Sequence, residues 1–355
     1  MNITALAKTL KENEGYLIVS PENARYFTAF DSSNAWIFVT ARKSVYMTDS
    51  RYIEAAGKNV DGCDEIVEMK SGGEQLKELA AAAGINTLYI ESSRMTLDTF
   101  ERLQKQLDGV CALVGGNTLD KAVDGIRSVK SDGEVEKILA AQKIAEKAFD
   151  EILDFIRVGV TEKEIALKLD FLMLSGGADA VSFETIAVSG KNSSMPHGVP
   201  CNKKIENGDF ITMDFGAVVD GYHSDMTRTV AVGNVSDEQK EIYGIVLAAQ
   251  EAALASLKAG VDCAAADAAA RDIIAANGYG AFFGHGTGHG VGVEIHEGPS
   301  LSPRSKSVLQ AGNVVTVEPG IYLPDKFGVR IEDMALITAT GHKNLTASPK
   351  SLIII

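Results

Sequence analysis

Cysteine is scarce in this 355-residue chain, and the few that occur are scattered. The four are Cys63, Cys111, Cys201 and Cys263, and no two of them form a CxxC pair. A disulfide framework and a zinc site built on thiolates are therefore not expected. Cys201 and Cys263 lie outside the motifs described below, and we interpret them as structural.

Long apolar runs and a targeting signal are also missing. No segment approaches the roughly 18 to 20 uncharged apolar residues that a membrane helix needs. The stretch MNITALAKTLKENEG lacks the basic start, apolar middle and cleavage site of a signal peptide, and it predicts an amphipathic surface helix instead. Together with the cysteine pattern, these features predict a cytoplasmic protein with no membrane partner.

The chain has no surplus of positive charge. Its formal net charge is −14, which argues against a nucleic-acid partner because binding to phosphates needs a basic surface. Bound cations would neutralise part of that charge. The apolar fraction of 45% is typical of a globular protein, and the length predicts two domains.

Strands and helices alternate in the first part of the chain, which predicts a compact α/β domain over residues 1–125. Short runs rich in β-branched and aromatic residues predict strands at 16–20, 35–40, 44–48 and 87–91. Helices are predicted at 55–60, 74–83 and 97–106.

A long helix beginning at about residue 132 is predicted to open a second domain over residues 132–355. Asp132 is a candidate N-cap, and Glu134 and Glu136 follow in the first turn, where carboxylates suit the helix dipole. Further helices are predicted at 162–174, 238–259 and 263–276, with strands and turns prevailing from about residue 292. This layout is α+β.

Histidine is sparse but unevenly distributed. The sequence has six histidines, and His285, His289 and His296 fall within twelve residues, in GHGTGHGVGVEIHEGP. Glycines between them leave the backbone open to close approach. A lone histidine is more often structural than a ligand, whereas three in one glycine-rich stretch favour a site.

Two aspartates flank a predicted hairpin in DFITMDFGAVVDGYHSDMTRTVAVG. Asp220 and Gly221 form a strong two-residue turn signal. If these two residues form the turn, residues at equal distances on either side of it pair across the hairpin, so the residue numbers of each pair add up to 441 and Asp214 faces Thr227. Asp225 lies two residues before Thr227 in the same strand, and residues two apart in a strand share a face. The two carboxylates are then diagonal neighbours within reach of one cation. The alternative is that one of them is a solvent-exposed edge charge.

Two glutamates lie near the ends of apolar strands further on. Glu318 ends the strand in NVVTVEPGIY, where Pro319 and Gly320 stop it. In KFGVRIEDMALIT, Arg330 and Glu332 are two residues apart and share one strand face. Taken alone, each glutamate has a plain alternative, a surface ion pair.

Taken together, these groups indicate a metal centre. Asp214, Asp225, Glu318 and Glu332 carry four negative charges on strands rich in apolar residues, and two divalent cations would neutralise them. His289 then supplies one neutral nitrogen. Carboxylate-dominated ligation with one imidazole suits Mn²⁺, Co²⁺ or Zn²⁺.

The same motifs resemble those of the M24 metallopeptidases, a family that includes methionine aminopeptidase, Xaa-Pro aminopeptidase, Xaa-Pro dipeptidase (prolidase) and the metal-free creatinase. MPHGVP, MDFGAVVDGYHSDMTRT, GHGTGHGVGVEIHEGP, VEPGIY and GVRIEDM match the family from about residue 132 onward. The resemblance implies a pita-bread catalytic domain with the metal ligands Asp214, Asp225, His289, Glu318 and Glu332. NARYFTAFDSSNAW and TDSRY resemble the creatinase-type N-terminal domain of the Xaa-Pro branch.

The resemblance also implies roles for residues around the metals. His197 and His296 match histidines on the substrate side that would stabilise charge on the scissile carbonyl, and Glu318 matches the ligand that shuttles a proton. His285 and Arg330 match groups beside the substrate or behind the metal ligands in the Xaa-Pro branch. By the family's chemistry, a hydroxide bridging two metal ions attacks the carbonyl.

The two remaining histidines are interpreted as structural or solvated. His223 sits near the hairpin tip, where a structural role is favoured over a functional one. His342 lies in a Gly-His-Lys segment that predicts a solvated turn.

The function implied is an Xaa-Pro aminopeptidase that releases the first residue of short peptides with proline second. The alternative is a prolidase restricted to Xaa-Pro dipeptides, in which Arg330 would close the pocket against the substrate carboxylate, although this arginine occurs in both branches. A metal-free creatinase-like hydrolase and a non-catalytic binding module are further alternatives that would be expected to lack ligands. The resemblance also implies two divalent ions, Mn²⁺ first among them, and a homodimer.

Overall fold

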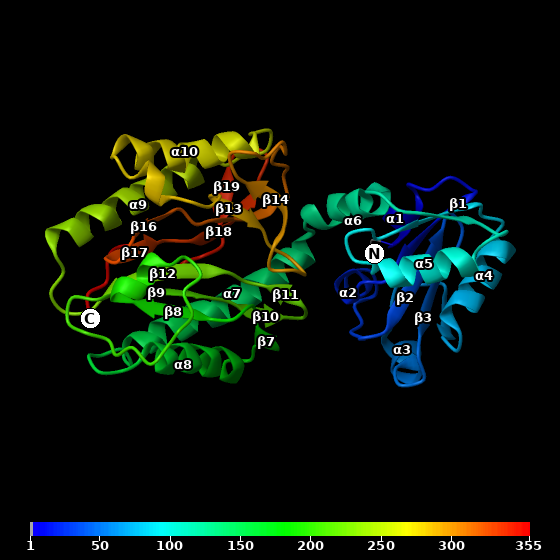
Figure 1. Ribbon diagram of the computed structural model, residues 1–355, viewed down its shortest axis with the longest axis horizontal. Coiled ribbons are helices and arrows are strands. Elements are labelled where there is room, and N and C mark those ends of the chain that lie inside the picture. The colour runs from blue at the N-terminus through cyan, green and yellow to red at the C-terminus, as the bar shows by residue number, and fades with distance from the viewer. Residues whose placement is uncertain (1–2) are drawn as a thin grey trace. The chain divides into compact units, whose positions relative to one another are not determined.

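The computed structural model describes residues 3–355, and these divide into two compact units, one ending at Arg127 and the other spanning Ser128–Ile355. Each unit has its own apolar core, and we describe them separately (Figure 1). All four cysteines are free thiols. Within the described residues, no helix is long and apolar enough to cross a membrane.

The first unit is built on a six-stranded mixed sheet in the order β4-β3-β2-β1-β5-β6. Apolar clusters lie on both of its faces, one under α1, α2, α3 and α6 and the other under α4 and α5. The strands are β1 (Glu14–Ile18), β2 (Ala35–Thr40), β3 (Ser44–Thr48), β4 (Glu65–Glu68), β5 (Thr87–Ile90) and β6 (Ala112–Val114). The helices are α1 (Ile3–Ala7), α2 (Pro21–Thr28), α3 (Ile53–Asn59), α4 (Gly72–Ala83), α5 (Leu97–Gln106) and α6 (Thr118–Ser128).

The predicted elements of this unit are confirmed, with shifts at their ends. The first strand begins and ends two residues earlier than predicted, and the N-terminal helix is shorter, with Ile3 and Leu6 buried. Four elements, β4, β6, α2 and α6, were not predicted from the sequence. β4 and β6 lie at the two sheet edges and are short and largely unburied, so they carry little apolar signal.

Local capping explains where the helices of the second unit begin. In α7 (Asp132–Leu153), Glu134 accepts a hydrogen bond of 2.9 Å from the backbone N–H of Ser131. Ser131 is therefore the N-cap and the prediction of Asp132 was wrong: a serine with a glutamate three residues later forms a capping box. Capping boxes also open α8 (Glu162–Ser175) and α9 (Asp237–Ser256).

The strands of the second unit lie between two pairs of helices. One apolar cluster joins α7 and α8 to the first strands, and another joins α9 and α10 (Cys263–Ala276) to the last strands, so that the sheets are covered from both sides (Figure 1). The early strands are β7 (Ala180–Val181), β8 (Ile186–Ser189), β9 (Phe210–Phe215), β10 (Ala217–Val219), β11 (Tyr222–His223) and β12 (Met226–Ala231). The late strands are β13 (Gly288–Gly290), β14 (Glu297–Leu301), β15 (Val314–Val317), β16 (Gly320–Leu323), β17 (Phe327–Arg330), β18 (Asp333–Ile337) and β19 (His342–Asn344). Short 3-10 helices η1 (Gly190–Ser194) and η2 (Gly280–Phe282) connect them.

The predicted hairpin register is confirmed. Asp214 pairs with Thr227 between β9 and β12, and Val218 pairs with His223 between β10 and β11. Asp220 and Gly221 form the turn with φ values of 49° and 73°, the left-handed conformations that a tight hairpin turn requires. The α+β fold class, with a smaller α/β N-terminal unit, is also confirmed.

Candidate active site

Four carboxylates and one imidazole reach the candidate site from the ends of separate strands. Asp214 lies on β9, Asp225 directly precedes β12, and His289 lies in β13. Glu318 follows β15, and Glu332 stands between β17 and β18. Backbone hydrogen bonds tie these segments together: the N–H of Glu332 donates to Thr227 at 3.1 Å, and that of Glu318 donates to Thr287 at 2.7 Å.

The side chains of Asp225, His289 and Glu332 converge on one point, with one donor atom of each within 4.8 Å of the others. The Nε2 atom of His289 is 3.6 Å from Oδ2 of Asp225 and 3.4 Å from Oε1 of Glu318. Asp214 lines the same cavity, and its Oδ2 accepts a 2.6 Å hydrogen bond from Arg330. The five residues predicted from the sequence therefore line one cavity.

The hydrogen bonds of His289 fix which of its nitrogens faces the carboxylates. Its Nδ1 lies 3.0 Å from the carbonyl of Gly290, to which a protonated Nδ1 donates. Burial lowers the pKa of His289, so the ring is neutral and carries its proton on Nδ1. The lone pair of Nε2 then points toward Asp225 and Glu318, as a metal-ligating imidazole requires.

The carboxylates are crowded in a way that disfavours their charged forms. Burial raises the pKa of Asp225 well above its ordinary value, and the neighbouring Glu332 and Asp214 raise it further. Burial, followed by the charges of Glu318 and Asp214, does the same to Glu332. Burial also raises the pKa of Glu318 to about 8. These groups repel one another unless cations lie between them.

The donor set fits divalent cations. The Oδ1 atoms of Asp214 and Asp225 are buried without any hydrogen-bond partner, although buried polar atoms are normally paired. Four carboxylates with one neutral imidazole match the charge of two divalent ions and the preference of borderline-hard metals for oxygen and nitrogen. No cysteine lines this cavity among residues 3–355.

A chain of hydrogen bonds lies behind Asp214. Arg330 donates from Nη1 to the hydroxyl of Tyr322 at 2.9 Å, and that hydroxyl lies 2.9 Å from Nε2 of His285. Arg330 also donates to the carbonyl of Pro196 at 3.2 Å. Arg330 and His285 both line the cavity, but the guanidinium is buried and engaged with protein acceptors.

The cavity above the carboxylates has a volume of about 490 Å³. His197 reaches it from an exposed loop after η1, and the ring of His296 lies 4.4 Å, centroid to centroid, from that of His289. Apolar side chains form part of its wall, namely Phe183, Ile186, Val199, Pro200 and Ile295. The cavity therefore combines an acidic floor, two flanking histidines and an apolar wall.

Glycines allow the strand that carries His289 to pack closely. A Cβ atom on Gly288 would lie 1.9 Å from the carbonyl oxygen of Thr316, and one on Gly290 would lie 2.3 Å from that of Gly298. Both distances are far below contact. The glycine-rich spacing noted in the sequence thus serves to place β13 between β14 and β15.

Two histidines lie outside the cavity. His223 is half-buried with its Nδ1 2.8 Å from the hydroxyl of Ser182. His342 begins β19 opposite Ile337 and is half-buried, and this burial lowers its pKa. The prediction of a solvated turn at His342 was wrong, because the turn closes earlier, where Thr338 donates to Gly341.

Three residues that act on the site were not predicted from the sequence as site residues. Tyr322 links His285 to Arg330, and Thr227 donates its hydroxyl proton to Glu332 at 2.7 Å. The buried Glu162 accepts hydrogen bonds from Ser189 and Cys201 at the two ends of the loop that carries His197. Tyr322 and Thr227 stand within the quoted motifs, whereas only the fold connects Glu162 with the loop.

Comparisons with known proteins agree with this geometry. The sequence profile of metallopeptidase family M24 matches residues 136–339, and that of the creatinase/prolidase N-terminal domain matches residues 3–129. The chain is 45% identical over 345 residues, 96% of each chain, to the uncharacterized peptidase YqhT of Bacillus subtilis. An Xaa-Pro dipeptidase structure from Bacillus anthracis superposes with a TM-score of 0.95 and 41% identity, covering 100% of this chain and 99% of that one. An X-Pro aminopeptidase structure from Thermotoga maritima superposes with a TM-score of 0.91 and 40% identity, covering 99% and 100%.

Proposed function

Because this chain belongs to metallopeptidase family M24, we propose that it cleaves the bond between an N-terminal residue and a following proline in short peptides. The observation that carries the proposal is the convergence of Asp225, His289 and Glu332 at the floor of a cavity with an apolar wall. The proposed metal ligands are Asp214, Asp225, His289, Glu318 and Glu332, holding two divalent ions, with Mn²⁺ the first candidate.

When bound, the two ions would polarise the scissile carbonyl and lower the pKa of a water molecule toward neutrality. The side chains around the ions would transfer the proton and stabilise the negative charge that develops on the carbonyl oxygen. Oε1 of Glu318 lies 3.2 Å from the hydroxyl of Thr316, and its carboxylate would accept a proton and return it to the departing nitrogen. His296 and His197, which also line the cavity, would donate hydrogen bonds to the oxygen that develops negative charge.

The apolar wall supports proline as the second residue. An Xaa-Pro bond is a tertiary amide with no N–H to recognise, so selectivity has to come from contact with the ring. Phe183, Ile186 and Ile295 offer such a surface in the cavity. Comparing Ala-Pro-Ala with Ala-Ala-Ala tests this point: equal cleavage of both peptides would rule out a proline-specific enzyme.

The state of Arg330 favours an aminopeptidase over a strict dipeptidase. Of the residues lining this cavity within the described chain, Arg330 is the only lysine or arginine, and its guanidinium is already bound to Asp214, Tyr322 and the carbonyl of Pro196. It is therefore poorly placed to hold the carboxylate of a dipeptide. We expect Ala-Pro-Ala to be cleaved at least as well as Ala-Pro.

A prolidase is the second candidate, and the similarity to the Bacillus anthracis protein named Xaa-Pro dipeptidase favours it. The two candidates share the metal site and differ in permitted substrate length. Rapid hydrolysis of Ala-Pro with no hydrolysis of Ala-Pro-Ala would establish the prolidase and reject the aminopeptidase.

The remaining alternatives conflict with the residues present. A metal-free creatinase-like hydrolase or a binding module has no need of five potential metal ligands in one cavity, two of them with unpaired buried oxygens. Metal analysis of the purified protein separates these alternatives from a metallopeptidase. We also propose a homodimer on the basis of the family, which sedimentation velocity would test.

A further inference from the structure

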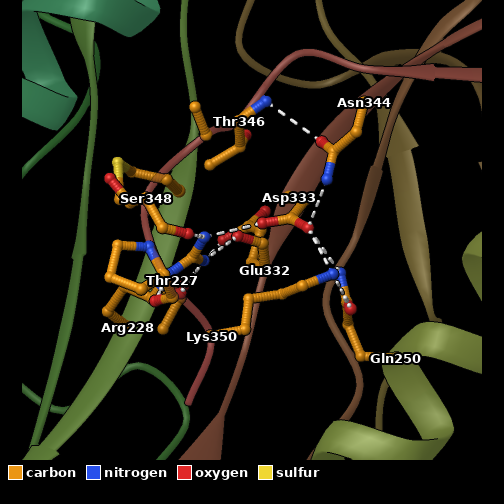
Figure 2. Close-up of polar contacts among 12 residues, drawn as sticks. Thr227, Arg228, Gln250, Glu332, Asp333, Asn344, Thr346, Ser348 and Lys350 are labelled. Atoms are coloured by element: carbon orange, nitrogen blue, oxygen red, sulfur yellow. Dashed lines mark hydrogen bonds and ion pairs between the residues drawn. The ribbon is translucent and has the colours of Figure 1, made fainter. Parts of the chain in front are cut away.

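Arg228 is a buried arginine that uses every hydrogen-bond donor it has. Its side chain is 1% exposed, and a guanidinium carries five N–H donors in a planar fork. Nε donates to the carbonyl of Pro349 at 3.0 Å. Nη1 donates to the carbonyls of Thr227 at 2.9 Å and Glu332 at 2.5 Å. Nη2 donates to the carbonyl of Ser348 at 2.7 Å and to Oδ1 of Asp333 at 2.8 Å (Figure 2).

The acceptors belong to segments that are distant in sequence. They lie in β12, in the link between β17 and β18, at the first residue of β18, and near the C-terminus. Asp333 neutralises the guanidinium and is itself saturated, since its Oδ2 accepts from Gln250, Asn344 and Lys350 at 3.1, 2.8 and 2.9 Å. The buried charges are therefore paired and hydrogen-bonded, the condition under which such a group holds its geometry.

Glu332 is the residue most tightly constrained by this arrangement. Its N–H donates to the carbonyl of Thr227, its own carbonyl accepts from Arg228, and its Oε2 accepts from the hydroxyl of Thr227 at 2.7 Å (Figure 2). Thr227 and Arg228 thus fix the backbone on both sides of Glu332 and one of its carboxylate oxygens. They also follow Asp225 by two and three residues, so the same strand carries one proposed ligand and positions another.

We propose that Arg228 is a positioning residue that orients the carboxylate of Glu332 for metal binding, an inference that rests on the proposed function. A lysine cannot replace it, because its ammonium has three donors and would leave at least two of the five contacts unmade. Loss of groups that orient a ligand typically weakens metal affinity by about 10- to 100-fold.

The competing explanation is that the network only anchors the C-terminal segment, and Lys350 provides the matched control. Its Nζ binds Oδ2 of Asp333 and Oε1 of Gln250, so Lys350→Met loosens the same segment and leaves the contacts of Arg228 with Glu332 in place. Wild type, Arg228→Lys and Lys350→Met are compared by calorimetric titration with MnCl₂, by kcat and KM for Ala-Pro-Ala, and by melting of the metal-free proteins.

We expect Arg228→Lys to bind Mn²⁺ at least about tenfold more weakly and to lose kcat with little change in KM, while Lys350→Met stays within about twofold of wild type in both. Wild-type affinity and kcat in Arg228→Lys, or an equal loss in Lys350→Met, would overturn the inference. If Arg228→Lys is not recovered folded, Arg228→Met is used in its place, because Lys350 still neutralises Asp333 in that variant. The results that support or overturn the inference are the same for Arg228→Met as for Arg228→Lys. Absence of Mn²⁺ binding by the wild type would instead overturn the proposed function and this inference with it.

Discussion

The Nε2 atom of His289 lies 3.6 Å from Oδ2 of Asp225, while the Nδ1 atom of the same ring is 3.0 Å from the carbonyl of Gly290. The backbone contact holds the proton on Nδ1, so the lone pair of Nε2 faces the carboxyl group of Asp225. When the carboxyl group is ionised, the two acceptor atoms repel each other, and a cation placed between them removes the repulsion.

Replacing Glu332 with alanine should lower kcat by more than about a hundredfold. Losing a group that only hydrogen-bonds a metal ligand costs about 10- to 100-fold in metal affinity or activity. Glu332 is itself a proposed ligand, so its loss should cost more than that. His342→Ala, which changes a histidine outside the cavity, should leave kcat within about twofold. Steady-state assays on Ala-Pro-Ala check both, and equal activities in the two variants would show that the site is wrongly assigned.

The metal-free protein should lose stability as the pH rises. Glu318 has a pKa raised by burial to about 8 in the folded chain against 4.5 as its ordinary value. When the pKa of a carboxyl group is higher in the folded than in the unfolded chain, its contribution to stability is fully present below the unfolded-state pKa and is lost as the pH rises through the folded-state pKa. The free energy lost is about 1.4 kcal/mol for each unit by which the two pKa values differ. The melting temperature of chelator-treated protein should therefore fall between about pH 5 and pH 8. Protein loaded with Mn²⁺ should show a much flatter profile, and identical profiles would contradict this assignment.

Tyr322→Phe should weaken the site without unfolding it. The change removes the hydroxyl that joins His285 to Arg330, and with it one of the contacts that hold the arginine against Asp214. We expect about a tenfold loss in Mn²⁺ affinity or kcat. Tyr279→Phe is the matched control, because Tyr279 packs against Phe282 and does not line the cavity. A null effect of Tyr322→Phe on both quantities would remove this chain of contacts from the account.

Glu162→Gln should raise KM more than it lowers kcat. The carboxylate accepts hydrogen bonds from the N–H of Ser189 at 2.7 Å and of Cys201 at 3.2 Å, at either end of the loop that carries His197. An amide turns one acceptor into a donor that faces other donors, so the loop should loosen. Glu164→Gln on the same helix keeps the capping box and should change neither constant. An unchanged KM in Glu162→Gln would mean that the loop is held by other contacts.

Local patterns predicted much of this fold and site because their information lies within short stretches. The turn at Asp220 and Gly221 set the register that pairs Asp214 with Thr227, and helical periodicity located α10 to the residue. Where short-range signals competed, the prediction failed: Ser131 rather than Asp132 caps α7 because its glutamate partner is three residues away. The contacts of Arg228 with the C-terminal segment span more than a hundred residues, and no local pattern contains them.

We propose that the site binds two metal ions and that hydrolysis needs both of them. Chelator-stripped protein titrated with MnCl₂ in a calorimeter, with Ala-Pro-Ala hydrolysis followed at each addition, tests it most directly. We predict that binding saturates at two ions per chain and that activity returns in step with occupancy. Full activity in stripped protein, or saturation with no hydrolysis at any occupancy, would contradict it.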